Sequence, residues 1–210
     1  MPEAHTTDPT RAKLLEAAGE VFAEQGFQTA TVREICARAG ANVAAVNYHF
    51  GDKVELYTEV LRQAACSVHD AALRSALTDA DPRVALRRMI RHMLERLCRV
   101  NRASCAMRLM IHELAQPTPA LARVVDEIIA PTSAMLRGVT GRLLGLPPDH
   151  DKTRLCALSV IAQVIHYVQA RPVIERLWPE FEMTDKNIER IARHIADFSL
   201  AYLTSKRKSS

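Results

Sequence analysis

The chain has 210 residues, of which 48% are hydrophobic and 25% are charged, and its formal net charge is +4. This balance is typical of a soluble globular protein with one large or two small domains, and it excludes pervasive disorder. The longest charge-free stretch of the C-terminal half, residues 155–170, is too short and too polar to span a bilayer, and residues 1–9 contain no apolar signal segment. We therefore expect a cytoplasmic protein that has no membrane partner.

Composition also favours an all-α fold. Ala, Leu, Arg and Glu are abundant, aromatic residues make up only 5% of the chain, and no segment has the features of a strand. The five cysteines are odd in number and have no CxxC spacing, which fits a reducing compartment better than a disulfide framework.

The sequence offers no motif for catalysis or for a cofactor. His112-Glu113 begins like a zinc-binding HExxH motif, but Gln116 stands where the second histidine is needed. A phosphate-binding glycine-rich loop and a nucleophile elbow are both missing from the sequence. We expect no enzymatic activity, no cofactor and no metal site.

Capping signals divide the N-terminal part into three short helices and a longer one. Asp8 followed by Pro9 is a typical helix start, and Thr31 and Asn42 can cap two further helices on either side of Gly40. The expected helices cover residues 9–26, 32–39, 42–50 and 52–77. Two short helices joined by a tight glycine turn are the layout of a helix-turn-helix, although this layout also occurs in ordinary helical bundles.

The remaining chain is predicted to be a helical bundle. Pro82 starts a helix, residues 116–119 separate two others, and Pro131 is expected to kink the longest one. The expected helices cover residues 82–101, 103–115, 120–146, 151–170 and 185–204, with a short bridge at 172–178.

Residues 10–59 resemble the DNA-binding domain of the TetR family of transcriptional regulators. The matching segments are residues 11–18, 22–27, 31–40 and 42–53. Within the last segment, Tyr48-His49-Phe50 followed by Lys53 is the most specific signature. The segments that are similar to the CecR-like branch of the family are residues 42–45, 113–121 and 170–179. The resemblance implies an N-terminal three-helix helix-turn-helix DNA-binding domain, residues 1–55, and a C-terminal helical bundle for ligand binding and dimerisation, residues 56–210.

The resemblance further implies that the third helix enters the major groove of double-stranded DNA. Asn47 can pair with adenine, an alanine of the same helix can contact a thymine methyl group, and Tyr48 and His49 can donate to phosphates. Lys53 and the start of the second helix are expected to contact phosphate as well. The expected DNA-binding residues are Thr31, Arg33, Asn42, Val43, Ala44, Ala45, Asn47, Tyr48, His49 and Lys53.

The distribution of charge weakens the general attraction of this part to DNA. Residues 1–60 hold five lysines and arginines against nine acidic residues, a net charge of −4, whereas the remainder of the chain carries +8. We therefore expect modest nonspecific affinity, with specificity concentrated in a palindromic operator.

Apolar stripes on the last two helices can face either the core of the chain itself or a second copy. From the seven-residue spacing alone, the core is the simpler interpretation. The resemblance instead implies a homodimer built from both helices. The expected interface residues are Leu155, Leu158, Ala162, Ile165, Ile188, Ile191, Ile195, Phe198 and Tyr202.

The middle helices are expected to bind a small-molecule effector. Methionines adapt to irregular ligands, although they also fill ordinary cores. The expected lining residues are Met93, Met107, Met110, His112, Met135, His166 and Tyr167.

These observations predict a repressor that binds its operator as a homodimer and is released by an effector. Two alternatives remain open at this point. One is a regulator that senses redox state or a metal through Cys98 and Cys105, which are seven residues apart. The other is a helical interaction protein that does not bind DNA and does not need exposed side chains at Tyr48, His49 and Lys53.

Overall fold

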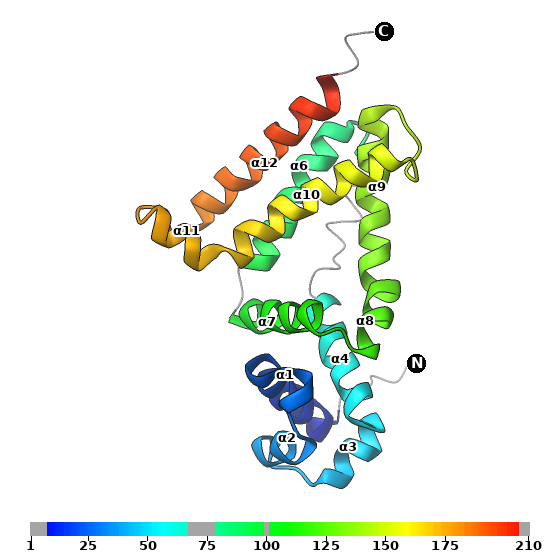
Figure 1. The fold of residues 1–210 in the computed structure, drawn as a ribbon, viewed down its shortest axis with the longest axis vertical. Coiled ribbons are helices and arrows are strands. Elements are labelled where there is room, and N and C mark those ends of the chain that lie inside the picture. The colour runs from blue at the N-terminus through cyan, green and yellow to red at the C-terminus, as the bar shows by residue number, and fades with distance from the viewer. Residues whose placement is uncertain (1–7, 67–78, 99–100, 206–210) are drawn as a thin grey trace, which may run out of the picture. The chain divides into compact units, whose positions relative to one another are not determined.

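The computed structural model describes residues 8–66, 79–98 and 101–205, without the side chains of residues 65, 66, 101–104, 106 and 107, and all regular elements in these ranges are helical. The helices, labelled in Figure 1, are α1 (Pro9–Thr29), α2 (Val32–Ala39), α3 (Val43–Phe50), α4 (Lys53–Cys66), α6 (Pro82–Cys98), α7 (Asn101–Ala115), α8 (Pro119–Val124), the π-helix η1 (Val125–Ile129), α9 (Ala130–Leu144), α10 (Asp151–Gln169), α11 (Arg171–Leu177) and α12 (Asp185–Ser205). Within the described ranges, none of these helices combines the length and the apolar character that a membrane crossing requires. The predicted all-α fold is confirmed.

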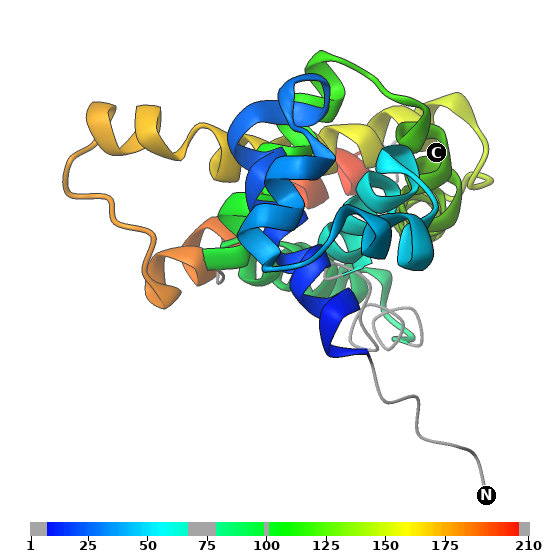
Figure 2. The ribbon, with the colours of Figure 1, turned by 90° about the horizontal axis from the view of Figure 1, so that it is seen from below.

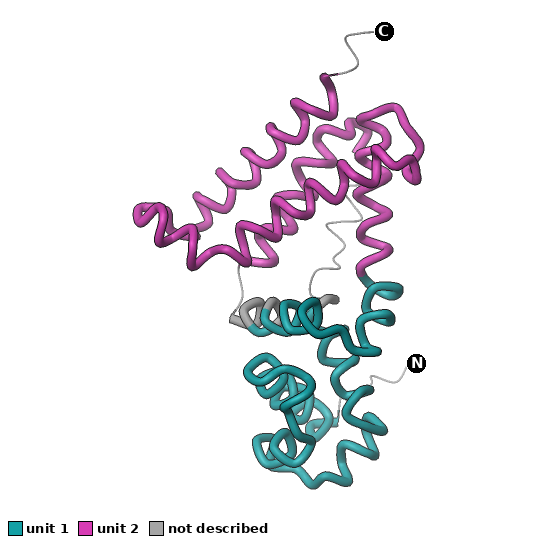
Figure 3. Tube along the Cα trace, viewed as in Figure 1, with its two compact units in different colours: residues 1–66, 101–128 teal, residues 67–100, 129–210 magenta. Residues whose placement is uncertain are grey.

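The chain folds into two compact units (Figure 3). Unit 1 comprises residues 1–66 and 101–128, so that α7 and α8 pack in the same unit as α1 and α4. Unit 2 comprises residues 67–100 and 129–210. The functional boundary expected between residues 55 and 56 stays a prediction, and the expected continuation of the fourth helix to residue 77 lies outside the described residues.

The first helix starts where the sequence predicts and bends near its predicted end. At its N-cap, Asp8 accepts a hydrogen bond from the backbone N–H of Thr10 (2.8 Å), and Pro9 follows. Gly26 interrupts the helix with φ 75° and ψ 171°. A Cβ atom there would lie 3.3 Å from Nδ1 of His112, so this position requires glycine for its positive φ and for the close approach of α7.

Side-chain caps and one glycine shape the turn between α2 and α3. Oγ1 of Thr31 accepts a hydrogen bond from the N–H of Glu34 (3.2 Å), and Oδ1 of Asn42 accepts one from the N–H of Ala44 (3.1 Å). Gly40 adopts the left-handed conformation with φ 63° and ψ 35°. The predicted caps and the predicted glycine turn are therefore confirmed.

Tyr57 of α4 lies within the core of unit 1. Its buried ring contacts Phe22 edge-on, with 4.7 Å between centroids, and also contacts Phe27 at 4.9 Å. Burying an aromatic side chain stabilises a fold by about 1.5–3 kcal/mol. This cluster therefore fixes α4 firmly against α1.

A buried carboxylate connects α7 to the start of α8. Oε1 of Glu113 accepts hydrogen bonds from the N–H (2.7 Å) and the hydroxyl (2.9 Å) of Thr118. Oγ1 of Thr118 in turn accepts one from the N–H of Ala120 and so caps α8. Burial chiefly, and the nearby Glu113 in addition, raise the pKa of Tyr57. The Tyr57 hydroxyl is buried and forms no hydrogen bond with Glu113. Glu113 thus lies beside α4 while it holds the α7–α8 corner.

The helix expected over residues 120–146 is divided into α8, η1 and α9. Pro131 has no backbone N–H, so it cannot donate to the carbonyl group four residues earlier. A π-helical turn at residues 125–129 lies directly before it. The irregularity expected at Pro131 therefore takes the form of a π-helical turn.

Unit 2 is a bundle of α6, α9, α10 and α12, and α11 projects from it where α10 and α12 are connected (Figures 1 and 2). The side chains of Ile188, Ile191 and Ile195 are buried in the core of this bundle. Their predicted place in a dimer interface is wrong. The apolar residues of α12 occupy more than one face of the helix. Helices of the same chain cover the face that carries the three isoleucines.

We expect Glu113→Ala to lower the free energy of unfolding by about 1–3 kcal/mol, because it leaves the two donors of Thr118 without their acceptor. Glu113→Gln keeps an acceptor oxygen and should cost clearly less. Urea denaturation measures both variants, with the exposed Glu127→Gln as a control that should change stability by no more than about 1 kcal/mol. Equal losses for the alanine and glutamine variants would contradict this role of Oε1.

Candidate DNA-binding surface and the grooves of unit 2

The third helix buries one face and presents the other to solvent. Val46 is fully buried, and Phe50 packs against the core of unit 1. Asn47 is exposed, and Tyr48 is 84% exposed. A tyrosine this exposed contributes little to packing, so its ring and hydroxyl are accessible to another molecule.

The predicted DNA-binding residues lie on three consecutive parts of unit 1: the start of α2, α3, and the start of α4. The exposed members are Thr31, Arg33, Asn42, Val43, Ala44, Asn47 and Tyr48. The partly buried members are Ala45, His49 and Lys53. Asn42 uses its side-chain oxygen to cap α3, which leaves its amide N–H groups for another acceptor.

Both basic side chains of the recognition motif, those of His49 and Lys53, already have partners within unit 1. Nε2 of His49 lies 3.5 Å from Oδ2 of Asp8, and the His49 side chain is only 11% exposed. Nζ of Lys53 lies 4.5 Å from the centroid of the Phe27 ring and donates to the carbonyl oxygen of Gln28 (3.4 Å). Burial lowers the pKa of Lys53. A DNA phosphate that approaches either side chain therefore competes with an internal contact.

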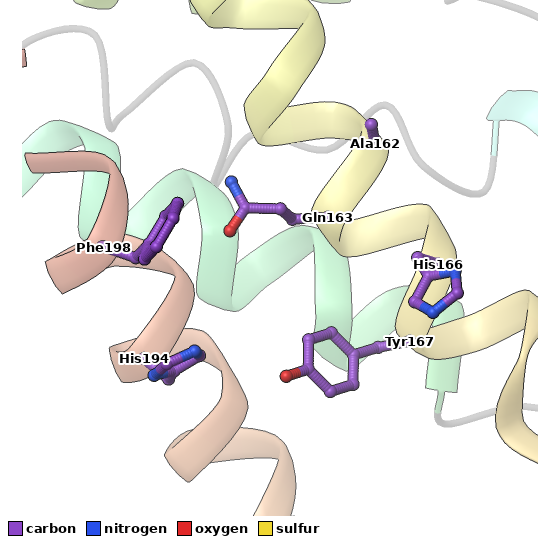
Figure 4. Close-up of a pocket in the computed structure, with 6 residues that line it drawn as sticks. All are labelled: Ala162, Gln163, His166, Tyr167, His194 and Phe198. Carbon is purple, nitrogen blue, oxygen red and sulfur yellow. The ribbon is translucent and has the colours of Figure 1, made fainter. Parts of the chain in front are cut away.

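Two adjoining grooves lie in unit 2 beside α10 and α12. The first has a volume of about 570 Å³, and in Figure 4 Gln163 and Tyr167 point from α10 toward α12. Its lining residues are Ala162, Gln163, His166, Tyr167, His194 and Phe198. The second, of about 420 Å³, is lined by His166, Tyr167, Ile174, Trp178, Phe181, Arg190, Ile191 and His194.

Only part of the expected effector site lines these grooves. His166 and Tyr167 line both of them. The other described members are Met93 and Met135, which belong to the core of unit 2, and Met110 and His112, which belong to unit 1. The side chain of Met107 lies outside the described residues. His194 lines both grooves but is not among the predicted residues, although it recurs with Phe198 and Tyr202 at intervals of four residues on α12.

Large apolar side chains of α10 and α12 remain exposed in the single chain. Leu155, Leu158, Phe198 and Tyr202 are all more than half exposed. Lys152 of α10 lies 5.7 Å from the centroid of the Tyr202 ring, so the exposed parts of the two helices are neighbours. Ala162 is exposed and Ile165 is partly buried. Contiguous exposed apolar surface of this kind is typical of a protein–protein interface.

The two cysteines considered for sensing belong to different units. Cys98 lies in unit 2 and Cys105 in unit 1, where its thiol donates to the carbonyl oxygen of Gly19 (3.1 Å). Burial raises the pKa of both thiols, which reduces the reactive thiolate fraction at neutral pH. In the part of the chain that the structure describes, no group of three or more His, Cys, Asp or Glu residues could hold a metal ion. These features favour a structural role for both cysteines.

Comparison with known proteins identifies both parts of the chain. Residues 14–60 match the family model of bacterial regulatory proteins of the tetR family, and residues 82–203 match the C-terminal domain of the HTH-type transcriptional dual regulator CecR. The CecR protein of Shigella flexneri is 26% identical over 171 residues, which cover 76% of each chain. The repressor NicS of Pseudomonas putida is 34% identical over 87 residues, which cover 41% of each chain. The chain thus spans less than half the length of NicS, and it spans 49% of the regulator AcrR of Shigella flexneri.

Solved structures of regulators share the fold over nearly the whole chain. A putative transcriptional regulator from Pseudomonas aeruginosa has a TM-score of 0.70 at 24% identity, with 96% of each chain covered. FadR from Bacillus subtilis, solved in complex with stearoyl-CoA, has a TM-score of 0.69 at 16% identity and covers 90% of this chain and 97% of its own. Together with the family model that matches more than half of the sequence, the helix-turn-helix and the C-terminal bundle show that the chain belongs to the TetR family of transcriptional regulators, with a C-terminal domain of the CecR type.

Proposed function

We propose that the protein represses transcription by binding a palindromic operator as a homodimer and that a small-molecule effector releases it. The observation that carries this proposal is the exposed face of α3 at Asn47 and Tyr48, which has no packing role in unit 1. NicS, a relative over 87 residues, is named as a repressor, which supports repression as the outcome of binding.

The exposed apolar surface of α10 and α12 supports the homodimer. A specific interface buries about 1,200–2,000 Å² in total, and two helices of this length can supply that area. A two-fold dimer presents two copies of α3 to half-sites about 34–36 Å apart, or a multiple of that distance. The proposed interface residues are Leu155, Leu158, Ala162, Ile165, Phe198 and Tyr202.

The second groove, which His166 and Tyr167 line and which contains none of the proposed interface residues, is the proposed location of the effector. Its lining is largely aromatic and aliphatic with a few polar groups, which is the usual character of a small-molecule site. FadR, which shares the fold, was solved with stearoyl-CoA bound, and this supports a ligand-responsive C-terminal domain. Effector and operator must then weaken the binding of each other by the same factor.

We expect Asn47→Ala to weaken binding to a duplex that the wild-type protein selects from genomic fragments by about 1–3 kcal/mol, because a base contact is lost. Tyr48→Ala should weaken binding to the selected duplex and to an unrelated duplex alike, because phosphate contacts carry no base information. Fluorescence anisotropy measures both, with Val173→Ala on exposed α11 as the control. Unchanged affinity in both variants would reject α3 as the DNA-reading helix.

The double variant Leu158→Arg with Phe198→Arg should shift the protein from dimer to monomer in analytical ultracentrifugation, because it places charges in the proposed interface. Its helical circular dichroism should be retained, since both side chains are exposed. Ile195→Ala removes a buried side chain instead and should lower unfolding stability by about 2–5 kcal/mol. If the double variant stays dimeric, the dimer interface does not lie at Leu158 and Phe198.

Small molecules that raise the melting temperature of the protein identify candidate effectors. For such a compound we expect its affinity to fall in the presence of the selected duplex by the same factor by which the compound lowers duplex affinity. Isothermal titration of the compound with and without the duplex measures this factor, and His166→Ala should weaken compound binding. Equal affinities in both titrations would contradict release by that effector.

A further inference from the structure

Three basic side chains near the recognition helix, those of His49, Lys53 and Arg11, face partners of their own unit. Besides the contacts of His49 and Lys53, Arg11 lies 3.2 Å from Glu59 and 5.2 Å from the centroid of the Phe50 ring. The contact of His49 differs from the others, because it joins a residue of the recognition motif to a carboxylate at the very start of α1. This carboxylate, Asp8, has no part in the family signature described above.

Asp8 holds two groups at once, one with each carboxylate oxygen. Oδ1 accepts the hydrogen bond from the N–H of Thr10 (2.8 Å) that caps α1, and Oδ2 lies 3.5 Å from Nε2 of His49. The hydrogen bond from Thr10 chiefly, and His49 in addition, lower the pKa of Asp8, so the carboxyl group is an anion at neutral pH. The Asp8 side chain is 49% exposed, so a duplex that reaches His49 also meets this negative charge.

We propose that Asp8 is an intramolecular competitor of DNA: in the free protein its carboxylate occupies the imidazole edge of His49 that a backbone phosphate takes over when α3 enters the major groove. The inference rests on DNA binding through α3. It adds to that function a residue of α1 that sets affinity without touching a base.

The exchange of Asp8 for a phosphate lowers the affinity for DNA slightly but does not prevent binding. The Asp8 carboxylate is 49% exposed and lies 3.5 Å from Nε2 of His49, and a contact of this length at a half-exposed carboxylate is weak, so the phosphate replaces Asp8 at small cost. The carboxylate then remains beside the duplex and repels it. Because neither group reads a base, Asp8 should lower affinity for all duplexes alike and leave sequence preference unchanged.

Asp8→Asn tests the proposal with little disturbance of the fold, because asparagine caps a helix as well as aspartate does. We expect this variant to bind both the selected duplex and an unrelated duplex about two- to fivefold more tightly. The matched control is Asp52→Asn. Asp52 is an exposed residue whose Oδ1 accepts from the N–H of Glu55 (2.9 Å), and its replacement removes one negative charge while the contact between Asp8 and His49 stays in place.

A double-mutant cycle separates competition at His49 from a general effect of charge. His49→Phe keeps a ring at this mostly buried position and removes both nitrogen atoms, and His49→Gln serves if the phenylalanine variant does not fold. In either background we expect Asp8→Asn to give no more than the gain seen for Asp52→Asn. Melting temperatures measured in parallel verify that each variant is folded.

The other outcomes overturn the proposal. Unchanged or weaker duplex binding by Asp8→Asn would show that Asp8 and His49 only position α3. A gain that persists in full without the His49 imidazole would show a general effect of charge. If the wild-type chain binds no duplex at all, the proposed function fails together with this inference, whereas the first two results leave DNA binding intact.

Discussion

The burial of Tyr57 is the constraint on which the geometry of the recognition helix depends. α4 begins only three residues after α3 ends, so whatever fixes α4 also fixes the direction of α3. The Tyr57 ring packs between Phe22 and Phe27 of the kinked first helix, and Glu113 lies next to its hydroxyl. With α4 held in this way, Val46 packs inward, and the opposite face of α3 remains exposed.

Helix caps could be predicted from the sequence because they depend on neighbouring residues. The sequence could not show which helices cover each apolar surface. The caps at Asp8, Thr31 and Asn42 depend on residues two or three positions away, and the structure contains all three. The interface residues on α12 were predicted from the family resemblance, whereas their spacing alone favoured the core of the chain. Spacing shows that Ile195 and Phe198 are apolar but not which helix covers each. The structure buries the former in the core of unit 2 and leaves the latter exposed, because α6 and α9 cover only part of α12. The exposure of Asn47 and Tyr48 on α3 agrees with the prediction from a known family signature, which adds information that periodicity lacks.

The N-terminal part is acidic, and several of its basic side chains contact carboxylates of the same unit. Arg38 lies within 4 Å of three carboxylates, those of Glu20, Glu24 and Glu34, which leaves it little capacity for DNA. Among the expected phosphate contacts, Arg33 is exposed, whereas His49 already faces a carboxylate. We therefore expect weak general attraction to DNA, with most of the binding free energy in contacts that depend on close fit. Such a surface favours discrimination between sequences over affinity for DNA as such.

The contact between α8 and α4 offers a route by which unit 2 can affect this fit. The chain passes from unit 1 to unit 2 within the π-helical turn, between residues 128 and 129. Close to this point, Arg123 of α8 pairs with Glu55 (2.6 Å) and Glu127 of η1 pairs with Arg62 (2.9 Å), so α8 and η1 each contact α4. These ion pairs are exposed and individually weak. A shift in this segment therefore meets little resistance at the ion pairs and reaches α4 directly, while the buried cluster around Tyr57 preserves the internal structure of unit 1.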